Sequence, residues 1–224
     1  MKEIAFLAKI TFLGDPIMQY IFKRGKDKRA PLFFMLHASG GTERDLVPLV
    51  KKFNETAPIL SVRGEGSDAG ETCFFNRAED GSVDREDFKE KTAQTAAFLR
   101  ETIKKYEMNE RHIIAVAHST GATMALHLLL KYPSLLKGAI LYHPLVYNLS
   151  REQVDLSEKY VFIGATKNDP FISVTETNTL YKYLHDAGAN VEVHWENGLH
   201  YLTGEEFAAS RMWFEKMEKD VFTR

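Results

Sequence analysis

The sequence lacks several features that would place it in a specialised class of protein. Its 224 residues include one cysteine, Cys73, which excludes an intramolecular disulfide framework and a multi-cysteine zinc site. No apolar run approaches the roughly 20 residues that a membrane-spanning helix needs. The 29 lysines and arginines are balanced by 31 acidic residues, which argues against a dedicated nucleic-acid-binding protein. What remains is a chain of ordinary globular composition, with 44% hydrophobic residues.

The first 13 residues are the only segment that resembles a targeting signal. Their apolar stretch is short, Lys9 interrupts it, and no small-x-small cleavage motif follows. We expect residues 1–13 to form an extra edge strand or a partly ordered arm of a single domain that spans 1–224. With one cysteine and no recognisable signal peptide, a cytoplasmic location is expected.

Short apolar runs alternate with helical patterns along the chain. This alternation predicts an α/β fold with a mostly parallel central sheet and helices on both faces. The run 191–195 alternates apolar and polar residues, which is typical of a strand nearer the sheet edge. The expected strands are 17–22, 32–36, 59–62, 113–117, 138–142, 160–164 and 191–195, and the expected helices are 42–53, 84–106, 120–130, 173–186 and one opened by Thr203. In such sheets, ligands bind beyond the carboxyl ends of the strands.

A candidate nucleophile follows the expected strand 113–117. The run Ala117-His118-Ser119-Thr120-Gly121 passes into an expected helix, so Ser119 lies at a strand–turn–helix corner. It differs by one residue from the nucleophile-elbow pattern Gly-x-Ser-x-Gly. Small residues are needed two positions before and after the serine because the tight turn brings strand and helix close together. A serine that only caps the following helix would give the same pentapeptide.

An acid and a base follow later strands in the order that this architecture requires. A serine hydroxyl needs a base held against it, and the expected chain order is Ser, then Asp or Glu, then His. Asp169 follows the expected strand 160–164, and His200 follows 191–195. We expect His200 to take the Ser119 proton and Asp169 to orient the imidazole. Each residue alone could be an ordinary loop residue, but their joint order favours a catalytic triad.

A glycine-rich segment, His37-Ala38-Ser39-Gly40-Gly41, follows the expected strand 32–36. Its backbone could direct an N–H group toward developing negative charge, with a second donor from the residue after the nucleophile. We therefore assign the oxyanion-hole donors to the N–H groups of Ser39 and Thr120. A plain glycine turn before a helix is the alternative.

The walls of the substrate pocket are indicated by residues that adjoin these loops. The connection 63–84 is long and contains several glycines, which is typical of a functional or mobile loop. Its two phenylalanines could line the pocket or anchor the loop in the core. The pocket candidates are His37, Phe74, Phe75, Arg77, His118, His143 and Leu199. No pair of histidines has metal-ligand spacing, so we expect neither a metal nor a cofactor.

With these residues in place, the sequence resembles the α/β-hydrolase superfamily, and within it the small bacterial phospholipase/carboxylesterase family. The resemblance extends to the branch that includes hydroquinone-response carboxylesterases, and its segments lie between residues 32 and 203. They are 37–41, 61–64, 74–77, 117–121, 137–141, 168–170 and 200–203. The resemblance implies an α/β-hydrolase fold and a cytosolic serine esterase. The segment 144–159 is short, so no large cap domain is expected.

The sequence departs from the family pattern at Ala38, Ala117 and Leu199, each of which adds a side chain near the site. The function that we expect is hydrolysis of small to medium carboxylic esters through an acyl-enzyme. A thioesterase, an amidase or a carbon–carbon hydrolase could use the same triad, and a non-catalytic ligand-binding protein could share the fold. The expected partner is a small-molecule ester, with no nucleic acid and no membrane, and the chain could form a homodimer.

Overall fold

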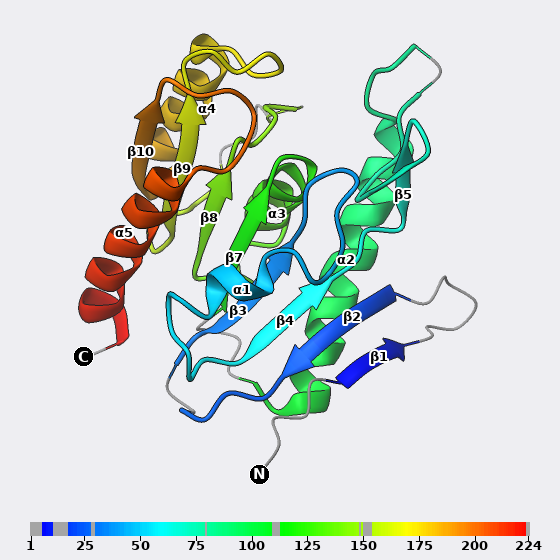
Figure 1. Cartoon of the computed structure of the whole chain (residues 1–224), viewed down its shortest axis with the longest axis vertical. Helices are drawn as coiled ribbons and strands as arrows, with labels where there is room; N and C mark the ends of the chain where they lie inside the picture. Colours follow the sequence, from blue (N-terminus) through cyan, green and yellow to red (C-terminus); the bar gives the residue numbers. More distant parts are fainter. Residues whose placement is uncertain are drawn as a thin grey trace.

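An eight-stranded sheet forms the centre of the molecule, in the order β1-β2-β4-β3-β7-β8-β9-β10 (Figure 1). This computed structural model describes residues 6–10, 18–27, 30–78, 80–108, 113–147, 149 and 154–222. The strands of the sheet are β1 (Phe6–Ile10), β2 (Met18–Lys23), β3 (Leu32–Leu36), β4 (Ile59–Val62), β7 (Ile113–His118), β8 (Gly138–Tyr142), β9 (Tyr160–Thr166) and β10 (Asn190–Glu196).

The pairs β1/β2 and β2/β4 are antiparallel, and every other pair in the sheet is parallel. All residues of β3, β4 and β8 are buried, as continuous apolar runs in a covered parallel sheet should be. The prediction of a mostly parallel sheet is confirmed, and the alternating strand β10 lies at its edge. At the opposite edge is β1, while the rest of residues 1–13 lies outside the described part.

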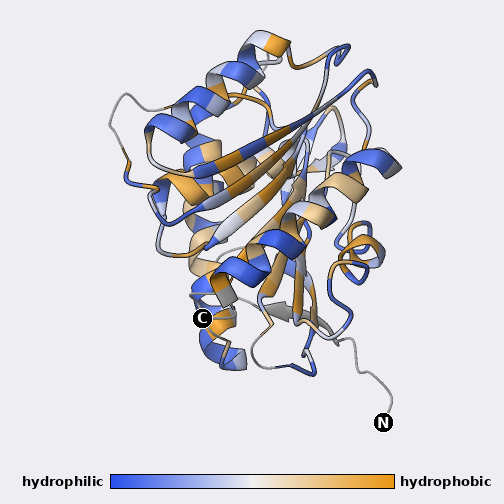
Figure 2. Ribbon diagram, turned by 90° about the vertical axis from the view of Figure 1, so that its left-hand side faces the viewer, coloured by the Kyte–Doolittle hydropathy of each residue, from blue (hydrophilic) through white to orange (hydrophobic). Residues whose placement is uncertain are grey.

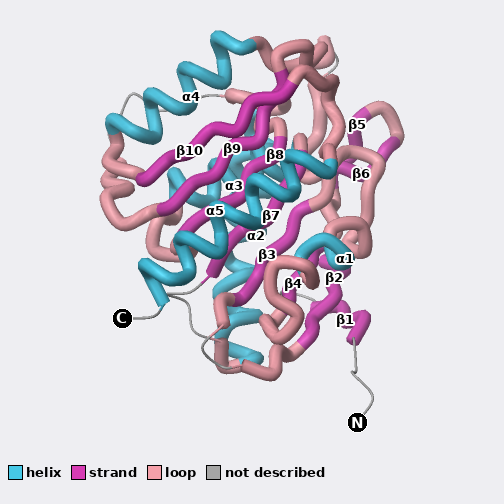
Figure 3. Tube along the Cα trace, turned by 60° about the vertical axis from the view of Figure 1, so that its left-hand side comes forward, coloured by secondary structure: helices cyan, strands magenta, loops and turns pink. Residues whose placement is uncertain are grey.

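Helices cover both faces of the sheet (Figures 2 and 3). One face packs against α2 (Arg85–Tyr106), α3 (Thr120–Lys131) and α4 (Val174–Asp186), and the other against α1 (Val47–Val50) and α5 (Gly204–Phe222). Figure 2 shows apolar strands between helices whose outer sides are hydrophilic. In the described segments between β8 and β9 no helix occurs, so no large cap stands over the sheet there.

The expected helix 42–53 is wrong for most of its length. Only Val47–Val50 is α-helical, and turns occupy the rest. The Asp45 carboxylate accepts hydrogen bonds from the N–H and the hydroxyl of Thr42, which satisfies the segment locally as a turn. Pro48 has no N–H to donate to a longer helix.

The long connection 63–84 contains a small hairpin that the sequence did not predict. It pairs β5 (Gly66–Asp68) with β6 (Glu71–Cys73). Both turn residues have positive φ angles, 51° at Ala69 and 87° at Gly70. Hairpin turns of this geometry normally carry Asn, Asp or Gly at both positions, so Ala69 gave no signal.

Candidate active site

The candidate residues lie at the carboxyl ends of neighbouring parallel strands. Ser119 stands between β7 and α3, Asp169 follows β9, and the loop after β10 carries His200. Because β7, β8, β9 and β10 are adjacent and parallel, their carboxyl ends lie along one edge of the sheet. The structure therefore brings together three residues that are separated by up to 81 positions in the sequence.

Ser119 lies on a sharp turn with a strained backbone. Its φ of 55° and ψ of −120° are disfavoured for a residue with a side chain. The Ser119 N–H donates to the carbonyl of Tyr142 at 2.8 Å, which holds the turn against β8. Gly121 is required for close approach, since a Cβ built there would lie 2.4 Å from the carbonyl oxygen of Leu36. This geometry matches the elbow expected from the pentapeptide.

Hydrogen bonds join the three side chains in a continuous line. Ser119 Oγ lies 2.8 Å from His200 Nε2, and His200 Nδ1 lies 2.7 Å from Asp169 Oδ2. A neutral imidazole with its proton on Nδ1 donates to the carboxylate and accepts from the serine hydroxyl. The arrangement therefore has a hydroxyl, a base that can take its proton and a carboxylate that orients the base.

Asp169 is fixed by hydrogen bonds to both of its oxygens. Oδ1 accepts from the backbone N–H groups of Phe171 and Ile172 at 2.9 and 3.1 Å, while Oδ2 faces His200 and His143. Burial alone would raise the pKa of Asp169, but hydrogen bonds from Phe171 N–H and the imidazoles outweigh it and lower the pKa. The carboxylate is therefore held ionised and oriented.

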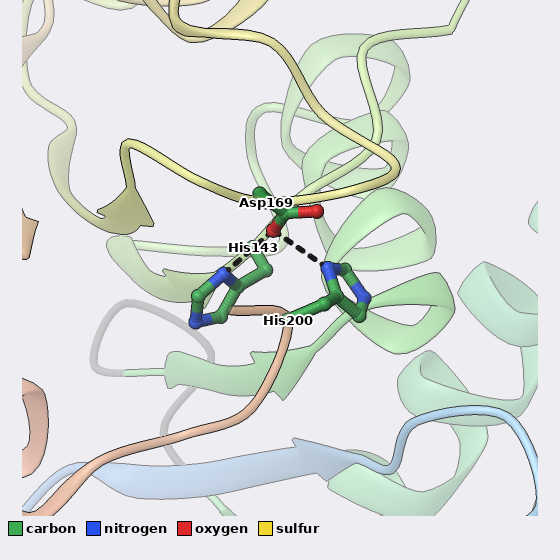
Figure 4. Close-up of side chains that lie close together, drawn as sticks. All are labelled: His143, Asp169 and His200. Carbon is green, nitrogen blue, oxygen red and sulfur yellow. Dashed lines mark hydrogen bonds and ion pairs between the residues drawn. The ribbon is translucent and has the colours of Figure 1, made fainter. Parts of the chain in front are cut away.

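His143 occupies the other side of Asp169 (Figure 4). Its Nδ1 is 3.0 Å from Asp169 Oδ2, and its Nε2 is 3.1 Å from Oε2 of Glu206 on α5. Burial acts to lower the pKa of His143, but hydrogen bonds and charges from Glu206 and then Asp169 outweigh that effect and raise it. His143 was expected in the pocket wall, but it does not line the cleft and instead contacts Asp169 Oδ2 beside His200.

The expected oxyanion segment lies beside the nucleophile. Ser39 and Thr120 contact each other, with their hydroxyl oxygens 3.2 Å apart. Thr120 begins α3, where the first backbone N–H groups have no acceptor within the helix. His37 holds the segment in place, because its Nε2 accepts from Gly64 N–H at 3.0 Å while its Nδ1 lies 2.6 Å from the carbonyl of Ala38. Burial lowers the pKa of His37, so the ring is neutral at pH 7.

A cleft of about 380 Å³ opens above Ser119. Its volume is at the lower end of the range for small-molecule sites. Arg77 and His118 are among the residues that line it, and Asp68 forms an ion pair with Arg77 at 3.1 Å. The lining residues are Ala38, Ser39, Asp68, Arg77, His118, Ser119, Thr120, Leu145, Phe171 and His200.

Besides His143, four pocket candidates do not line this cleft. Phe74 and Phe75 are buried in the core, where Phe75 packs edge-on against Phe88 of α2, so they anchor the loop rather than face a ligand. The ring of His37 points into the loop that it supports. Leu199 is 53% exposed, outside the cleft, and its carbonyl accepts a hydrogen bond from Thr166.

His118 stands between the cleft and the other histidines. Its ring centroid is 5.6 Å from that of His143 and 5.8 Å from that of His200. Burial, with additional repulsion from His143 and His200, lowers the pKa of His118 to about 3. The ring is therefore neutral at pH 7 and lines the cleft without adding charge.

Comparisons with known proteins identify the chain's family. The model of the phospholipase/carboxylesterase family matches residues 74–217. The chain is 37% identical over 199 residues to a protein of Bacillus subtilis (strain 168) named "Putative hydrolase MhqD", covering 89% of this chain and 98% of that protein. The chain belongs to the phospholipase/carboxylesterase family.

Solved structures of similar proteins agree with this membership. The crystal structure of a Bacillus cereus carboxylesterase matches with a TM-score of 0.86 and 40% identity, covering 89% of this chain and 94% of that one. A structure of YahD with malic acid matches with a TM-score of 0.83 and 26% identity, covering 89% and 98%. This member of the phospholipase/carboxylesterase family thus has the α/β-hydrolase fold and is a carboxylesterase-type hydrolase.

Several site residues of this carboxylesterase-type chain could not be found from the sequence. Asp68, Leu145 and Phe171 line the cleft, but they stand in connections without a motif. Glu206 had one local signal, because Thr203-Gly-Glu-Glu206 reads as a capping box. That box is present, with Glu206 N–H donating to Thr203 Oγ1 and Thr203 N–H to Glu206 Oε2. Its contact with His143, 63 positions away, had no sequence signal.

The donor atoms of His143, Asp169 and His200 lie within 4.8 Å of one another, as a metal site would require. The two imidazoles, however, lie at hydrogen-bond distances from the same Asp169 oxygen. An ion bonded to this oxygen and to both rings would have to displace these hydrogen bonds. The arrangement fits shared protons better than a metal cation.

No helix in the described part of the chain is both long and apolar enough to cross a membrane.

Proposed function

We propose that this protein is a serine carboxylesterase that hydrolyses small to medium carboxylic esters through an acyl-enzyme. Ser119 is the nucleophile, His200 the general base and acid, and Asp169 the residue that orients His200. The observation that carries the proposal is the line of hydrogen bonds from Ser119 Oγ to His200 and on to Asp169, at 2.8 and 2.7 Å. Membership of the carboxylesterase family supports the same reaction.

In the acylation step, Ser119 Oγ attacks the ester carbonyl carbon as its proton passes to His200 Nε2. The N–H groups of Ser39 and Thr120 stabilise the negative charge on the carbonyl oxygen. The tetrahedral intermediate collapses, the carbon–oxygen bond to the alcohol breaks, and the proton on His200 leaves with the alcohol. An acyl group then remains on Ser119.

Deacylation repeats these roles with water as the nucleophile. His200 takes a proton from the water, whose oxygen attacks the acyl carbon, and the proton is then returned to Ser119 Oγ. The carboxylic acid is released and the free hydroxyl is restored. Throughout the cycle, Asp169 holds the proton on His200 Nδ1 and stabilises the imidazolium.

The cleft supports a substrate of small to medium size. The residues that line its volume of about 380 Å³ include two apolar ones, Leu145 and Phe171, and the Asp68–Arg77 ion pair. An acyl chain fits against the apolar part, and a polar group of the substrate fits near Arg77. Homodimer formation, a cytoplasmic location and a single domain over 1–224 stay predictions.

The three departures from the family pattern do not interrupt this site. Ala38 lies at the cleft wall, Ala117 is buried in β7, and Leu199 points away to solvent. None separates Ser119 from His200, which counts against a binding protein without activity. Rates measured on a panel of esters, thioesters, amides and carbon–carbon substrates identify the leaving group, which is an alcohol, a thiol, an amine or a carbon acid respectively.

Labelling by a fluorophosphonate probe tests the proposal. We expect a covalent adduct on Ser119 in the folded wild-type chain, none in Ser119→Ala, and a burst of nitrophenol with p-nitrophenyl acetate. A Ser119→Ala variant that keeps the wild-type turnover would overturn the proposal. A chain without adduct and without turnover of any ester would do the same.

A further inference from the structure

The hydrogen-bonded line does not end at Asp169. Oδ2 of this carboxylate faces two imidazoles, His200 Nδ1 at 2.7 Å and His143 Nδ1 at 3.0 Å (Figure 4). Through His143 Nε2 the line continues to Glu206 Oε2 at 3.1 Å. Five side chains from different elements are thereby joined, beginning at Ser119 in the centre of the sheet and ending on the first turn of α5.

The inner part of this line is closed to solvent. The side chains of His143 and Glu206 are 0% exposed and that of Asp169 is 2% exposed. A neutral imidazole carries one N–H and would present a bare nitrogen to one of its two carboxylates, whereas an imidazolium donates to both. Buried carboxylates are costly unless they are paired. A charged His143 donates one hydrogen bond to each of them, to Asp169 Oδ2 and to Glu206 Oε2.

The other groups that face His143 do not compete for this charge. His118 on β7 is held neutral, since its pKa is lowered to about 3. The ring of His200 packs edge-on against that of His143, with centroids 5.2 Å apart, and its Nδ1 faces the same oxygen of Asp169. The hydroxyl of the neighbouring Tyr142 forms a hydrogen bond with Ser210 Oγ rather than with His143. The raised pKa of His143 agrees with the charge that the geometry requires.

The local backbone is arranged around this contact at some cost. His143 has a φ of 51°, in the left-handed region that residues with side chains avoid, and its N–H donates to the carbonyl of Gly164 at 2.9 Å. Gly164 leaves room for Glu206, because a Cβ built there would lie 2.8 Å from Glu206 Oε1. The capping box also holds this carboxylate, because Thr203 N–H donates to the same Glu206 Oε2 that faces His143.

We propose that His143 and Glu206 are positioning residues of the catalytic array: Glu206 stabilises a doubly protonated His143, and His143 directs the ionised Asp169 toward His200. This inference rests on the proposed esterase function. The charge of His143 adds to the backbone N–H groups of Phe171 and Ile172 in holding Asp169 as an oriented acceptor. Glu206 offsets that positive charge, so the group of three keeps one net negative charge with which to stabilise the His200 imidazolium during catalysis.

The test measures the protonation of His143 and the rate on the same full-length proteins. Nitrogen-15 shifts of histidine-labelled protein are recorded at about pH 8, where an ordinary histidine is neutral. The His143→Asn variant identifies the signals, since asparagine tolerates a positive φ. Glu206→Gln removes the charge and keeps the shape. Ser210→Ala is the matched control, because it removes a buried neutral hydrogen bond from the same helix.

We expect wild-type His143 to carry two protons at this pH and the Glu206→Gln variant to lose one of them. The kcat/KM of Glu206→Gln with p-nitrophenyl acetate should fall about 10- to 100-fold, less than the roughly 10²–10⁴-fold that general acid–base catalysis supplies in full. The Ser210→Ala control should stay within about threefold of wild type, as a change outside the reacting groups should.

A His143 ring with one proton in the wild type overturns the inference, and so does a Glu206→Gln rate equal to that of Ser210→Ala. Should Glu206→Gln fail to fold, the wild-type spectrum and the rate of His143→Asn decide instead. Failure of the proposed function looks different: the wild type then takes no fluorophosphonate label at Ser119, while the protonation of His143 is still measured.

Discussion

The backbone of Gly121 lies against the carbonyl oxygen of His37, so that a Cβ atom on Gly121 would be 2.4 Å from this oxygen. The contact joins the beginning of α3, just after the candidate nucleophile, to the segment that carries Ser39. A larger residue at this one position should therefore alter the distance between Ser119, the proposed nucleophile, and Ser39, a proposed oxyanion-hole donor.

Gly121→Ala should lower both stability and activity. Backbone atoms cannot move aside as the end of a side chain can, so overpacking should cost about 1–3 kcal/mol of unfolding free energy. Urea denaturation and kcat/KM measure the two effects. Gly204→Ala is the control, because a Cβ there would meet no atom within 4 Å. Equal stability and rate in Gly121→Ala and the control would contradict the expected crowding.

Asp169→Asn should reduce kcat by about 10³- to 10⁴-fold, the scale seen when the orienting carboxylate of a triad is neutralised. The amide has an N–H₂ group where the carboxylate accepts from His200, which favours the wrong imidazole tautomer. Steady-state kinetics measure the effect. Asp155→Asn, at an exposed turn where the carboxylate caps Ser157, should retain wild-type kcat. A loss below about tenfold in Asp169→Asn would argue against the orienting role.

The folded protein should lose stability in weak acid because of His118. Its folded pKa of about 3 is below the ordinary value of 6.5, so the unfolded chain binds the proton first. Above pH 6.5 the neutral ring makes its full contribution to the stability of the folded protein, and this contribution is lost as the pH falls toward 3. Between pH 7 and 5 the loss should be about 2 kcal/mol. Urea denaturation at each pH should show that the unfolding free energy of His118→Gln falls by about 2 kcal/mol less than that of the wild type between pH 7 and 5. An equal fall in the two proteins would refute the lowered pKa of His118.

Arg77→Ala should raise KM and leave kcat within about threefold, because the side chain lines the cleft without contacting the catalytic groups. Stability should change by less than about 1 kcal/mol, since the ion pair with Asp68 is partly exposed. Initial-rate kinetics with esters of different polarity measure the effect. Arg211→Ala, whose ion pair with Glu215 is on α5, is the control. A fall in kcat alone would place Arg77 in a different role.

Substitution of two phenylalanines by alanine should affect different properties, stability at Phe75 and substrate binding at Phe171. Phe75 is fully buried, so Phe75→Ala should cost about 3–5 kcal/mol of unfolding free energy. Phe171 is 67% exposed at the cleft, and Phe171→Ala should change KM with little loss of stability. Thermal or urea unfolding together with kinetics measure both. A stable Phe75→Ala variant with a raised KM would restore Phe75 to the pocket wall.

Local patterns predicted the parts of the fold that depend on local physics. Continuous apolar runs correctly predicted β3, β4, β7 and β8, and the helix expected at 173–186 is present as α4, which begins after a capping box at Ser173. The helix expected at 42–53 was wrong because Asp45 bonds to Thr42 as a turn, which propensity does not anticipate.

The candidate triad was predictable because parallel strands bring their carboxyl ends together, so chain order carries spatial information. The hairpin β5–β6 and the placement of Phe75 were not, since burial in a long connection depends on contacts with α2. The role of His143 was equally hidden. Its partner Glu206 has a local explanation as part of a helix cap. Only the folded chain shows that His143 lies between this carboxylate and the Asp169 carboxylate, which also faces His200.

The edge position of β10 has a consequence for how this protein loses activity. β7 is hydrogen-bonded to strands on both sides, so Ser119 is held from two directions, whereas β10 has β9 as its only neighbour in the described sheet. His200, the proposed base, therefore follows the strand with fewer neighbours in the sheet. On heating, we expect β10 and the loop with His200 to separate from the sheet first. Activity should therefore be lost at a lower temperature than the one at which the strands around Ser119 unfold.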